Sequence, residues 1–317
     1  MRDFLAITGP TTSGKTQVSI AVAEALDGEI ICMDSRQVYR GMDIGTDKVS
    51  TENRDRVRHH GLDLRNPDEC YSAGQFGRDA RPWIEEISGR GRVPLVVGGT
   101  GLFLRALTDP LFKQPDIDPT RLEALRGFMA TRPTTELERW VGALDSGRTD
   151  FAREGGPQRL GRTIEVALLT GRPLSWWHAQ GTPDQEPLNG LIVVLDGDRE
   201  ELDRRIDARV TRMAAEGLVD EVKGLIEKGY GSQDPGMSGT GYREITAYLG
   251  GEMTLEEALD RMRSQTRQYA RRQLTWFRHQ LPEDAIHVDT SWPLDAQVAE
   301  VVASWRPKDR AISGRGE

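Results

Sequence analysis

The chain has 317 residues and a formal net charge of −8, which allows one large domain or two smaller ones. The acidic balance disfavours a protein that coats nucleic acid nonspecifically, although it leaves room for a locally basic groove. Cys32 and Cys70 are the only cysteines, which excludes a disulfide framework or a cysteine metal cluster. Because no apolar stretch approaches the roughly 20 residues that span a bilayer, and no signal peptide is evident, we expect a cytosolic protein without a membrane partner.

Strand and helix signals alternate over the first 110 residues. In chain order they predict a strand at 4–8, a helix at 14–26, a strand at 30–33, a helix at 73–87 and a strand at 93–97. The second strand ends at Asp34 and the third runs into Gly-Gly-Thr-Gly, which contains Thr100. Ligands bind outside the carboxyl ends of parallel strands, so we expect Asp34 and Thr100 to share a cleft with the first loop.

The first loop carries the most specific motif. Residues 9–16 read GPTTSGKT and match G-x-x-x-x-G-K-[ST] between a predicted strand and a predicted helix. Backbone N–H groups and the helix N-terminus would hold phosphates, Lys15 would add a cation, and the Thr16 hydroxyl would ligate Mg²⁺. A tight strand-to-helix turn is the structural alternative, but it needs neither side chain. The predicted site for a diphosphate or a nucleotide such as ATP comprises Gly9, Pro10, Thr11, Thr12, Ser13, Gly14, Lys15 and Thr16.

Two further positions have both structural and chemical interpretations. Asp34 could bind Mg²⁺ through water, act as a general base or cap a turn, and its place facing Lys15 favours catalysis. Thr100 could approach a ligand closely or simply belong to a glycine turn. The strand at 191–195 ends at Asp196, which resembles the acidic magnesium strand of ATP-hydrolysing enzymes.

The middle of the chain changes character. Prolines mark a linker at 110–119, residues 119–170 have only helical periodicity, and strand character returns at 191–195. We therefore predict an α/β fold with a P-loop NTPase-like parallel sheet core flanked by helices, interrupted by an all-helical insertion domain. The predicted domains are residues 1–115 with 186–305 for the core and 116–185 for the insertion, and a disordered tail is expected at 306–317.

Arginines gather on predicted helices. Arg263, Arg267, Arg271 and Arg278 fall within an arc of about 80° at 100° per residue, and acidic partners at i±4 are absent after Asp260. This pattern favours contact with an RNA backbone over a salt-bridged surface helix. Similar arcs contain Arg205 with Arg209, as a candidate phosphate clamp, and Gln158, Arg159 and Arg162, as a second candidate RNA surface.

Six sequence blocks occur in a characteristic order. They are the phosphate loop, DSRQVYRGMDIGT, LVVGGTGLFLRAL, PQRLGRTIEV, GYREI and TRQYARRQLTWFR. Over roughly residues 4–280 the chain thus resembles the tRNA dimethylallyltransferase (tRNA isopentenyltransferase) family. The resemblance implies transfer of a dimethylallyl group from dimethylallyl diphosphate to N6 of the adenosine immediately 3′ of the tRNA anticodon. It also implies Mg²⁺ as cofactor, the anticodon stem-loop as partner and a monomeric enzyme.

The resemblance also implies residue roles. Asp34 would accept the N6 proton, Thr100 would hold the diphosphate, and Lys15 and Arg209 would neutralise its charge, with Thr16 on Mg²⁺. The implied tRNA contacts are Asp34, Ser35, Arg36, Gln37, Thr100, Gln158, Arg159, Leu160, Gly161, Arg162, Gly241, Tyr242, Arg243, Arg267 and Arg271. The chain departs from the family pattern at Gly155 and Gly156, where many relatives carry Asn-Asp.

Two other functions remain open from the residues alone. An ATP-dependent nucleoside or small-metabolite kinase would use the phosphate loop and Asp196, but it leaves the DSRQVY block and the insertion unexplained. A nucleotide-gated RNA-binding protein without catalysis would tolerate the loss of Asp34.

Overall fold

The computed structural model describes residues 2–109, 117–180 and 185–305. The chain divides into two compact units, Met1–Asp109 with Pro187–Glu317 (the core unit) and Pro110–Glu186 (the helical unit). The predicted disordered tail at 306–317 and most of the predicted linker lie outside the described residues.

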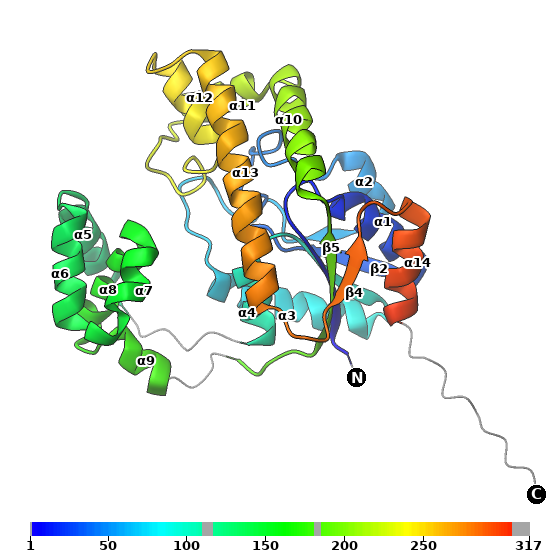
Figure 1. Ribbon diagram of the computed structural model, residues 1–317, viewed down its shortest axis with the longest axis horizontal. Coiled ribbons are helices and arrows are strands. Elements are labelled where there is room, and N and C mark those ends of the chain that lie inside the picture. The colour runs from blue at the N-terminus through cyan, green and yellow to red at the C-terminus, as the bar shows by residue number, and fades with distance from the viewer. Residues whose placement is uncertain (1, 110–116, 181–184, 306–317) are drawn as a thin grey trace, which may run out of the picture. The chain divides into compact units, whose positions relative to one another are not determined.

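A six-stranded parallel sheet forms the centre of the core unit (Figure 1). Its strands are β1 (Phe4–Thr8), β2 (Gly28–Cys32), β3 (His59–His60), β4 (Val93–Val97), β5 (Gly190–Asp196) and β6 (Ile286–Asp289). Their order is β3-β2-β4-β1-β5-β6, and every neighbouring pair is parallel. The predicted P-loop NTPase-like α/β sheet is confirmed, and all described strands end at the same edge.

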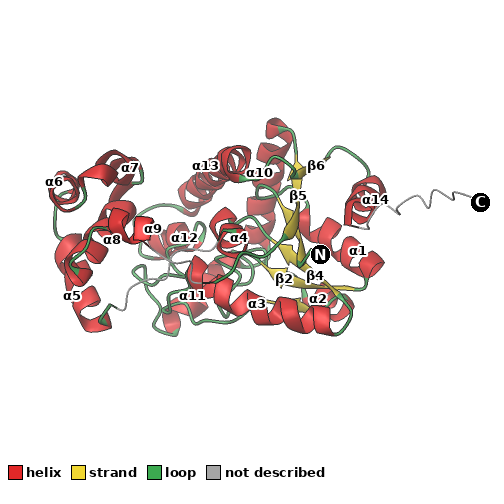
Figure 2. Cartoon of the chain, turned by 90° about the horizontal axis from the view of Figure 1, so that it is seen from below, coloured by secondary structure: helices red, strands yellow, loops and turns green. Residues whose placement is uncertain are grey.

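Helices cover both faces of this sheet. The helices of the core unit are α1 (Lys15–Leu26), α2 (Thr51–Arg56), α3 (Ala73–Gly89), α4 (Gly101–Thr108), α10 (Arg199–Ala215), α11 (Leu218–Glu227), α12 (Tyr242–Leu249), α13 (Leu255–Gln280) and α14 (Leu294–Trp305). Helices α1 and α14 lie on one face, and α3 and α4 lie on the other (Figure 2). Burial on both faces explains why strands such as β1 are apolar without alternation.

A second apolar cluster lies beyond the strand ends. It joins the segment after β2, through Val38 and Met42, to α10, α11, α12 and α13. Tyr242 and Met262 are buried within it. This cluster places the DSRQVYRGMDIGT block against the arginine-rich helices. No helix among the described residues is long and apolar enough to cross a bilayer.

Only helices occur in the described part of the helical unit, in agreement with the predicted all-helical insertion. They are α5 (Pro119–Ala130), α6 (Thr134–Leu144), η1 (Ser146–Arg148), α7 (Thr149–Glu154), α8 (Gly156–Thr170) and α9 (Leu174–Gln180). The unit has its own core, in which Val141, Leu160 and Ile164 are fully buried. Asp118 caps α5 by accepting the amides of residues 120 and 121, and Pro119 occupies the first turn, where its missing N–H costs nothing.

Candidate active site

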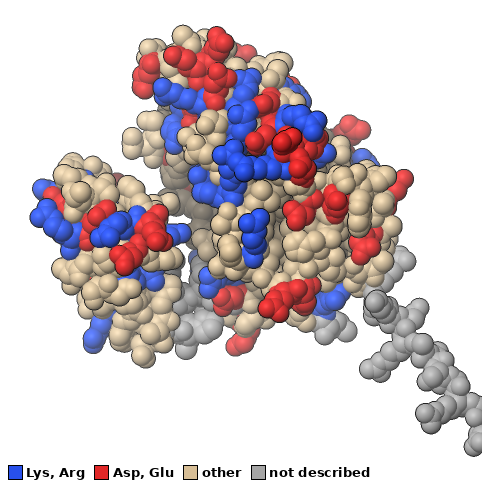
Figure 3. All heavy atoms as spheres, viewed as in Figure 1, with Lys and Arg blue, Asp and Glu red and all other residues tan. Residues whose placement is uncertain are grey.

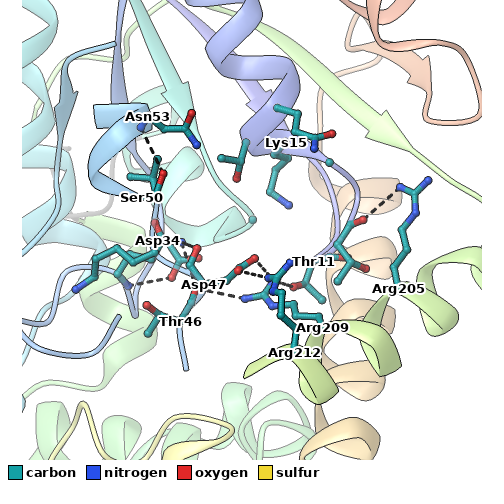
Figure 4. Close-up of a pocket in the computed structure, with 18 of the residues that line it drawn as sticks. Thr11, Lys15, Asp34, Thr46, Asp47, Ser50, Asn53, Arg205, Arg209 and Arg212 are labelled. Carbon is teal, nitrogen blue, oxygen red and sulfur yellow. Dashed lines mark hydrogen bonds and ion pairs between the residues drawn. The ribbon is translucent and has the colours of Figure 1, made fainter. Parts of the chain in front are cut away.

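A pocket of about 800 Å³ opens at the carboxyl edge of the sheet. Residues from the phosphate loop, from the segment after β2 and from α10 and α13 line it (Figure 4). Of the predicted site residues, the pocket brings together Thr11, Thr12, Gly14, Lys15, Thr16, Asp34, Gln37 and Arg209.

The phosphate loop has a backbone that requires glycine. Gly9 has φ of 150°, and a Cβ there would lie 2.6 Å from the Leu195 carbonyl oxygen. Gly14 precedes α1 with φ of 88°, in the left-handed region. These turns direct the loop into the N-terminus of α1, an arrangement that suits a bound anion.

Lys15 folds over its own loop. Its Nζ donates hydrogen bonds to the carbonyl oxygens of Gly9 at 2.9 Å and Pro10 at 2.6 Å. Burial lowers the pKa of Lys15 to about 8, an effect that Asp34 opposes and Arg209 increases. A bound diphosphate would favour the charged ammonium and raise this pKa again.

Asp34 uses one carboxylate oxygen in a turn. Oδ1 accepts the backbone N–H groups of Arg36 at 2.8 Å and Gln37 at 3.4 Å. No hydrogen bond from the described residues reaches Oδ2. The turn-capping interpretation is therefore correct for one oxygen, and the other oxygen is available to a ligand in the pocket.

Thr100 lies beside Asp34 rather than capping its own helix. Its Oγ1 accepts the Ser35 backbone N–H at 3.3 Å, and no side-chain bond to the start of α4 accompanies it. The Thr100 side chain also hydrogen-bonds Tyr269; burial and the nearby Asp34 raise the pKa of this tyrosine to about 12. The two predicted strand-end residues, Asp34 and Thr100, are thus linked through Ser35.

Arg209 reaches the pocket from α10. Its guanidinium donates to Thr11 Oγ1 at 3.1 Å and to the Thr46 carbonyl oxygen at 3.3 Å, and it lies 3.5 Å from Asp47 Oδ2. Asp47 also pairs with Arg212. Burial lowers the pKa of Arg209, with Asp47 and Asp34 opposing that shift. In Figure 4 Lys15 and Arg209 lie on opposite sides of the pocket, an arrangement of positive charge that suits a polyanion.

Gln273 on α13 joins two loops and was missed by the sequence interpretation. Its Oε1 accepts the Thr11 backbone N–H and its Nε2 donates to the Gly99 carbonyl oxygen, both at 2.8 Å. Gln273 belongs to the TRQYARRQLTWFR block, but the spacing of the arginines in that block gives no sign of its role. Other pocket residues that the sequence did not predict include Thr46, Asp47, Arg212 and Tyr269, whereas Arg205, the predicted partner of Arg209 in a phosphate clamp, does line the pocket.

The oxygen atoms of the pocket fit a magnesium ion held together with phosphate. Thr16 lies exposed in the first turn of α1 and lines the same pocket as Asp34. The described residues contain no group of three or more His, Cys, Asp or Glu side chains that could hold a metal alone. Mg²⁺ commonly needs only one or two protein oxygens beside phosphate and water, so the Thr16 hydroxyl together with a bound diphosphate suffices.

The predicted arginine stripe on α13 does have acidic partners. Arg263 pairs with Asp260 on its own helix, whereas Arg267 pairs with Asp207 and Arg271 lies 3.8 Å from Asp203. Acidic partners at i±4 are indeed absent after Asp260, but one partner lies three residues before Arg263 and the other two aspartates belong to α10. Figure 3 shows basic and acidic side chains interleaved in this region.

On α8 the structure separates exposed from buried candidates. Gln158 and Arg159 are exposed, but Leu160 is fully buried, so its side chain is not available to RNA. Arg159 lies over the Phe151 ring at 4.3 Å, and a Cβ at position 155 would collide with its side chain. Gly155 therefore makes room for this arrangement. Gly161 and Arg162 are partly exposed, and Arg162 pairs with Glu165.

Two other predicted contact segments are engaged within the core unit. Tyr242 is 1% exposed and donates its hydroxyl proton to Glu221, so its side chain is unavailable to RNA. Gly241 is buried, whereas Arg243 is exposed beside Glu244. Arg36 donates to the Pro235 carbonyl oxygen at 2.7 Å. Direct RNA contact by these side chains remains a prediction for Arg36 and Arg243.

Asp196 lies elsewhere. It lines a different pocket, with His287 and Asp289 at the ends of β5 and β6, and it does not line the pocket that contains Lys15 and Thr16. The arrangement gives no support to Asp196 as the magnesium ligand of a kinase.

Comparison with known proteins identifies the family. The model of a family described as IPP transferase matches residues 37–280, and one described as isopentenyl transferase matches residues 2–69. The tRNA dimethylallyltransferase 2 of Geotalea uraniireducens is 42% identical over 274 residues, which cover 86% of this chain and 88% of the relative. The tRNA dimethylallyltransferase of Geobacter metallireducens is 43% identical over 272 residues, with the same coverage.

Solved structures agree with this result. The tRNA isopentenylpyrophosphate transferase of Bacillus halodurans has a TM-score of 0.70 and 35% identity, over 96% of this chain and 95% of that chain. A eukaryotic dimethylallyltransferase acting on tRNA has a TM-score of 0.76 and 27% identity, over 92% of this chain and 74% of that chain. The sequence blocks, the phosphate loop on a parallel sheet and these similarities lead to one conclusion: the chain belongs to the tRNA dimethylallyltransferase, or IPP transferase, family.

Proposed function

We propose that this protein transfers a dimethylallyl group from dimethylallyl diphosphate to N6 of the adenosine immediately 3′ of the anticodon in tRNA. One observation carries the proposal: Lys15, Arg209 and Asp34 line a single pocket, and only Oδ1 of Asp34 accepts hydrogen bonds from the described residues. Two cations suit a departing diphosphate, and the adjacent carboxylate suits removal of a proton.

The diphosphate is the leaving group in this reaction. The carbon–oxygen bond of an allylic diphosphate breaks as negative charge grows on the departing oxygen. Lys15, Arg209 and the free backbone N–H groups of the phosphate loop would stabilise that charge, and Thr100 would help to hold the diphosphate. Mg²⁺ held by Thr16 would add positive charge beside it.

The nucleophile needs a base. The N6 lone pair of adenine is delocalised into the ring, which makes the amine a weak nucleophile. Asp34 Oδ2 would accept the N6 proton as the new carbon–nitrogen bond forms. The adenine must leave the anticodon-loop stack to reach the pocket. The exposed arginines would contact the tRNA backbone while the base is held in this position. The cytosolic location and the monomeric state remain predictions.

A mass-shift assay tests the proposal. Purified protein is incubated with Mg²⁺, dimethylallyl diphosphate and an unmodified tRNA that carries adenosine 3′ of the anticodon. We expect the tRNA to gain one dimethylallyl group and pyrophosphate to be released in equal amount. A matched tRNA with guanosine at that position is the control and should remain unchanged.

The alternatives give different results in the same assay. ATP consumption with a phosphorylated product would establish the kinase, which the family assignment already disfavours. Binding of tRNA without any mass change would establish an RNA-binding protein without catalysis.

A further inference from the structure

We propose that Glu221 on α11 is a positioning residue for the diphosphate pocket, acting through the segment 43–47 on Arg209. The inference rests on the proposed function in one respect, that Arg209 contacts the diphosphate. Glu221 itself does not line the pocket, so its effect would be indirect.

The Glu221 carboxylate receives an unusual set of hydrogen bonds. Oε2 accepts the backbone N–H groups of Asp43 at 2.8 Å and Ile44 at 2.7 Å, and Oε1 accepts that of Gly45 at 3.1 Å. The Tyr242 hydroxyl donates to Oε1 at 2.6 Å. One carboxylate therefore holds three consecutive amides, and hydrogen bonds to an ionised acceptor are stronger than neutral ones.

Residues 46 and 47, which follow the three amides bound by Glu221, both contact Arg209. The Thr46 carbonyl oxygen accepts Arg209 Nη2, and the Asp47 carboxylate pairs with the same guanidinium. Asp47 has φ of 52°, which is uncommon for a residue with a side chain. A residue with a side chain and a positive φ needs support from its surroundings. The amides bound by Glu221 belong to residues 43–45, which end two positions before Asp47.

Tight packing against Tyr242 fixes the position of the segment 43–47 beside Glu221. A Cβ at Gly45 would lie 2.6 Å from the Tyr242 ring, so the segment passes directly over this buried tyrosine. Burial and the Glu221 charge raise the pKa of Tyr242 well above its usual value. The hydroxyl therefore keeps its proton and remains a donor to the carboxylate.

The test replaces Glu221 with glutamine. In Glu221→Gln the side chain keeps its size, but its NH₂ group would face a backbone N–H and the charge would be lost. We expect pyrophosphate to bind about tenfold more weakly, because hydrogen bonds to a charged acceptor are lost. Calorimetry without tRNA measures this affinity. The KM for dimethylallyl diphosphate should rise similarly, with kcat changed less than threefold. Glu227→Gln, which removes the same charge from an exposed site on α11, should behave as wild type.

A double-mutant cycle separates positioning from general damage. In an Arg209→Ala background, Glu221→Gln should weaken pyrophosphate binding less than twofold further, because its target is already missing. Unchanged pyrophosphate affinity in the folded single variant would overturn the proposal, as would full additivity with Arg209→Ala.

A milder variant keeps the proposal testable if Glu221→Gln does not fold. Tyr242→Phe removes one of the four donors and should weaken pyrophosphate binding about threefold, again only when Arg209 is present. Wild-type affinity in this variant would then overturn the role of Glu221. Since pyrophosphate binding requires no turnover, a wild-type protein that binds pyrophosphate but transfers no prenyl group would refute only the proposed function.

Discussion

At Asp34 the two oxygens of one carboxylate have different surroundings. Oδ1 caps the turn that leads to Arg36 and Gln37, while Oδ2 accepts no hydrogen bond from the described residues, and the side chain lines the pocket. From the sequence, capping and catalysis were alternatives, because the sequence does not show that one side chain can offer a separate oxygen for each.

This division makes Asp34→Asn informative. The asparagine oxygen can still accept the two amides, so the turn should persist, but the side chain can no longer take a proton. We expect dimethylallyl transfer to fall by about two to four orders of magnitude, the range for a lost general base, with tRNA and pyrophosphate affinity unchanged. Rapid-quench measurement of transfer checks this, and undiminished turnover would rule out Asp34 as the base.

Lys15 predicts a pH dependence of ligand binding. Burial lowers its pKa to about 8, and the protonated form binds the anion. As pH rises through 8, binding must take up a proton, so the affinity for dimethylallyl diphosphate should fall by up to about tenfold per pH unit. Calorimetry between pH 7 and pH 9, in buffers with different heats of ionisation, measures both effects.

Lys15→Arg is the matched control for this titration. The guanidinium stays charged throughout the range, so its binding profile should be flatter than that of wild type. If the wild-type affinity is itself constant between pH 7 and pH 9, the lysine is not the titrating group.

At the scale of single elements, α13 performs two tasks. Gln273 on its inner side joins the phosphate loop to the loop after β4, and the arginines near it pair with aspartates of α10. The sequence predicted a helix that carries Arg263 to Arg278, and the structure adds a capping box of Thr254 and Glu257 at its start. The sequence could not predict the partners, because these come from a helix about sixty residues earlier.

The arginine stripe of α13 is tested by salt dependence. If Arg267 contacts a tRNA phosphate, Arg267→Ala should reduce the slope of log affinity against log salt concentration by about one. Asp207→Asn, which releases Arg267 from its ion pair, should strengthen binding at low salt. Filter binding over a salt series checks both, and Arg261→Ala on the exposed side of the same helix is the control. An unchanged slope would leave the stripe as a salt-bridged surface.

Short elements were the hardest to predict. β3 contains only two residues, and α12 begins at Tyr242 in a segment without clear periodicity. α14 was also missed. These elements form because the sheet edge and the second apolar cluster already exist, so their stability comes from contacts distant in sequence rather than from local patterns.

At the scale of the molecule, the two units have separate apolar cores. We expect Leu160→Ala, in the core of the helical unit, to destabilise that unit by about 2–5 kcal/mol. Pyrophosphate affinity should not change, whereas tRNA affinity should fall. Calorimetric melting together with the two binding measurements checks this. Leu168→Ala, on the exposed side of α8, is the control, and a loss of pyrophosphate binding in Leu160→Ala would show that the units are not independent.

The overall architecture was predictable because its signals are local. Apolar runs at 4–8 and 93–97 and the helix-period segments gave the alternating α/β order, and the switch to helical periodicity after 119 gave the insertion. The pocket was only partly predictable: the phosphate loop and Asp34 belong to recognisable blocks, but Asp47 lies outside every block and enters the pocket through the tertiary fold.

The contact between Gln273 and the phosphate loop has a consequence for synthesis on the ribosome. The loop at 9–16 emerges first, yet the side chain that receives the Thr11 amide is made more than 250 residues later. A nascent chain therefore carries the diphosphate motif for most of its synthesis without the walls that α10 and α13 supply. Premature termination before residue 273 would leave a fragment whose pocket lacks Gln273 and its contact with the phosphate loop.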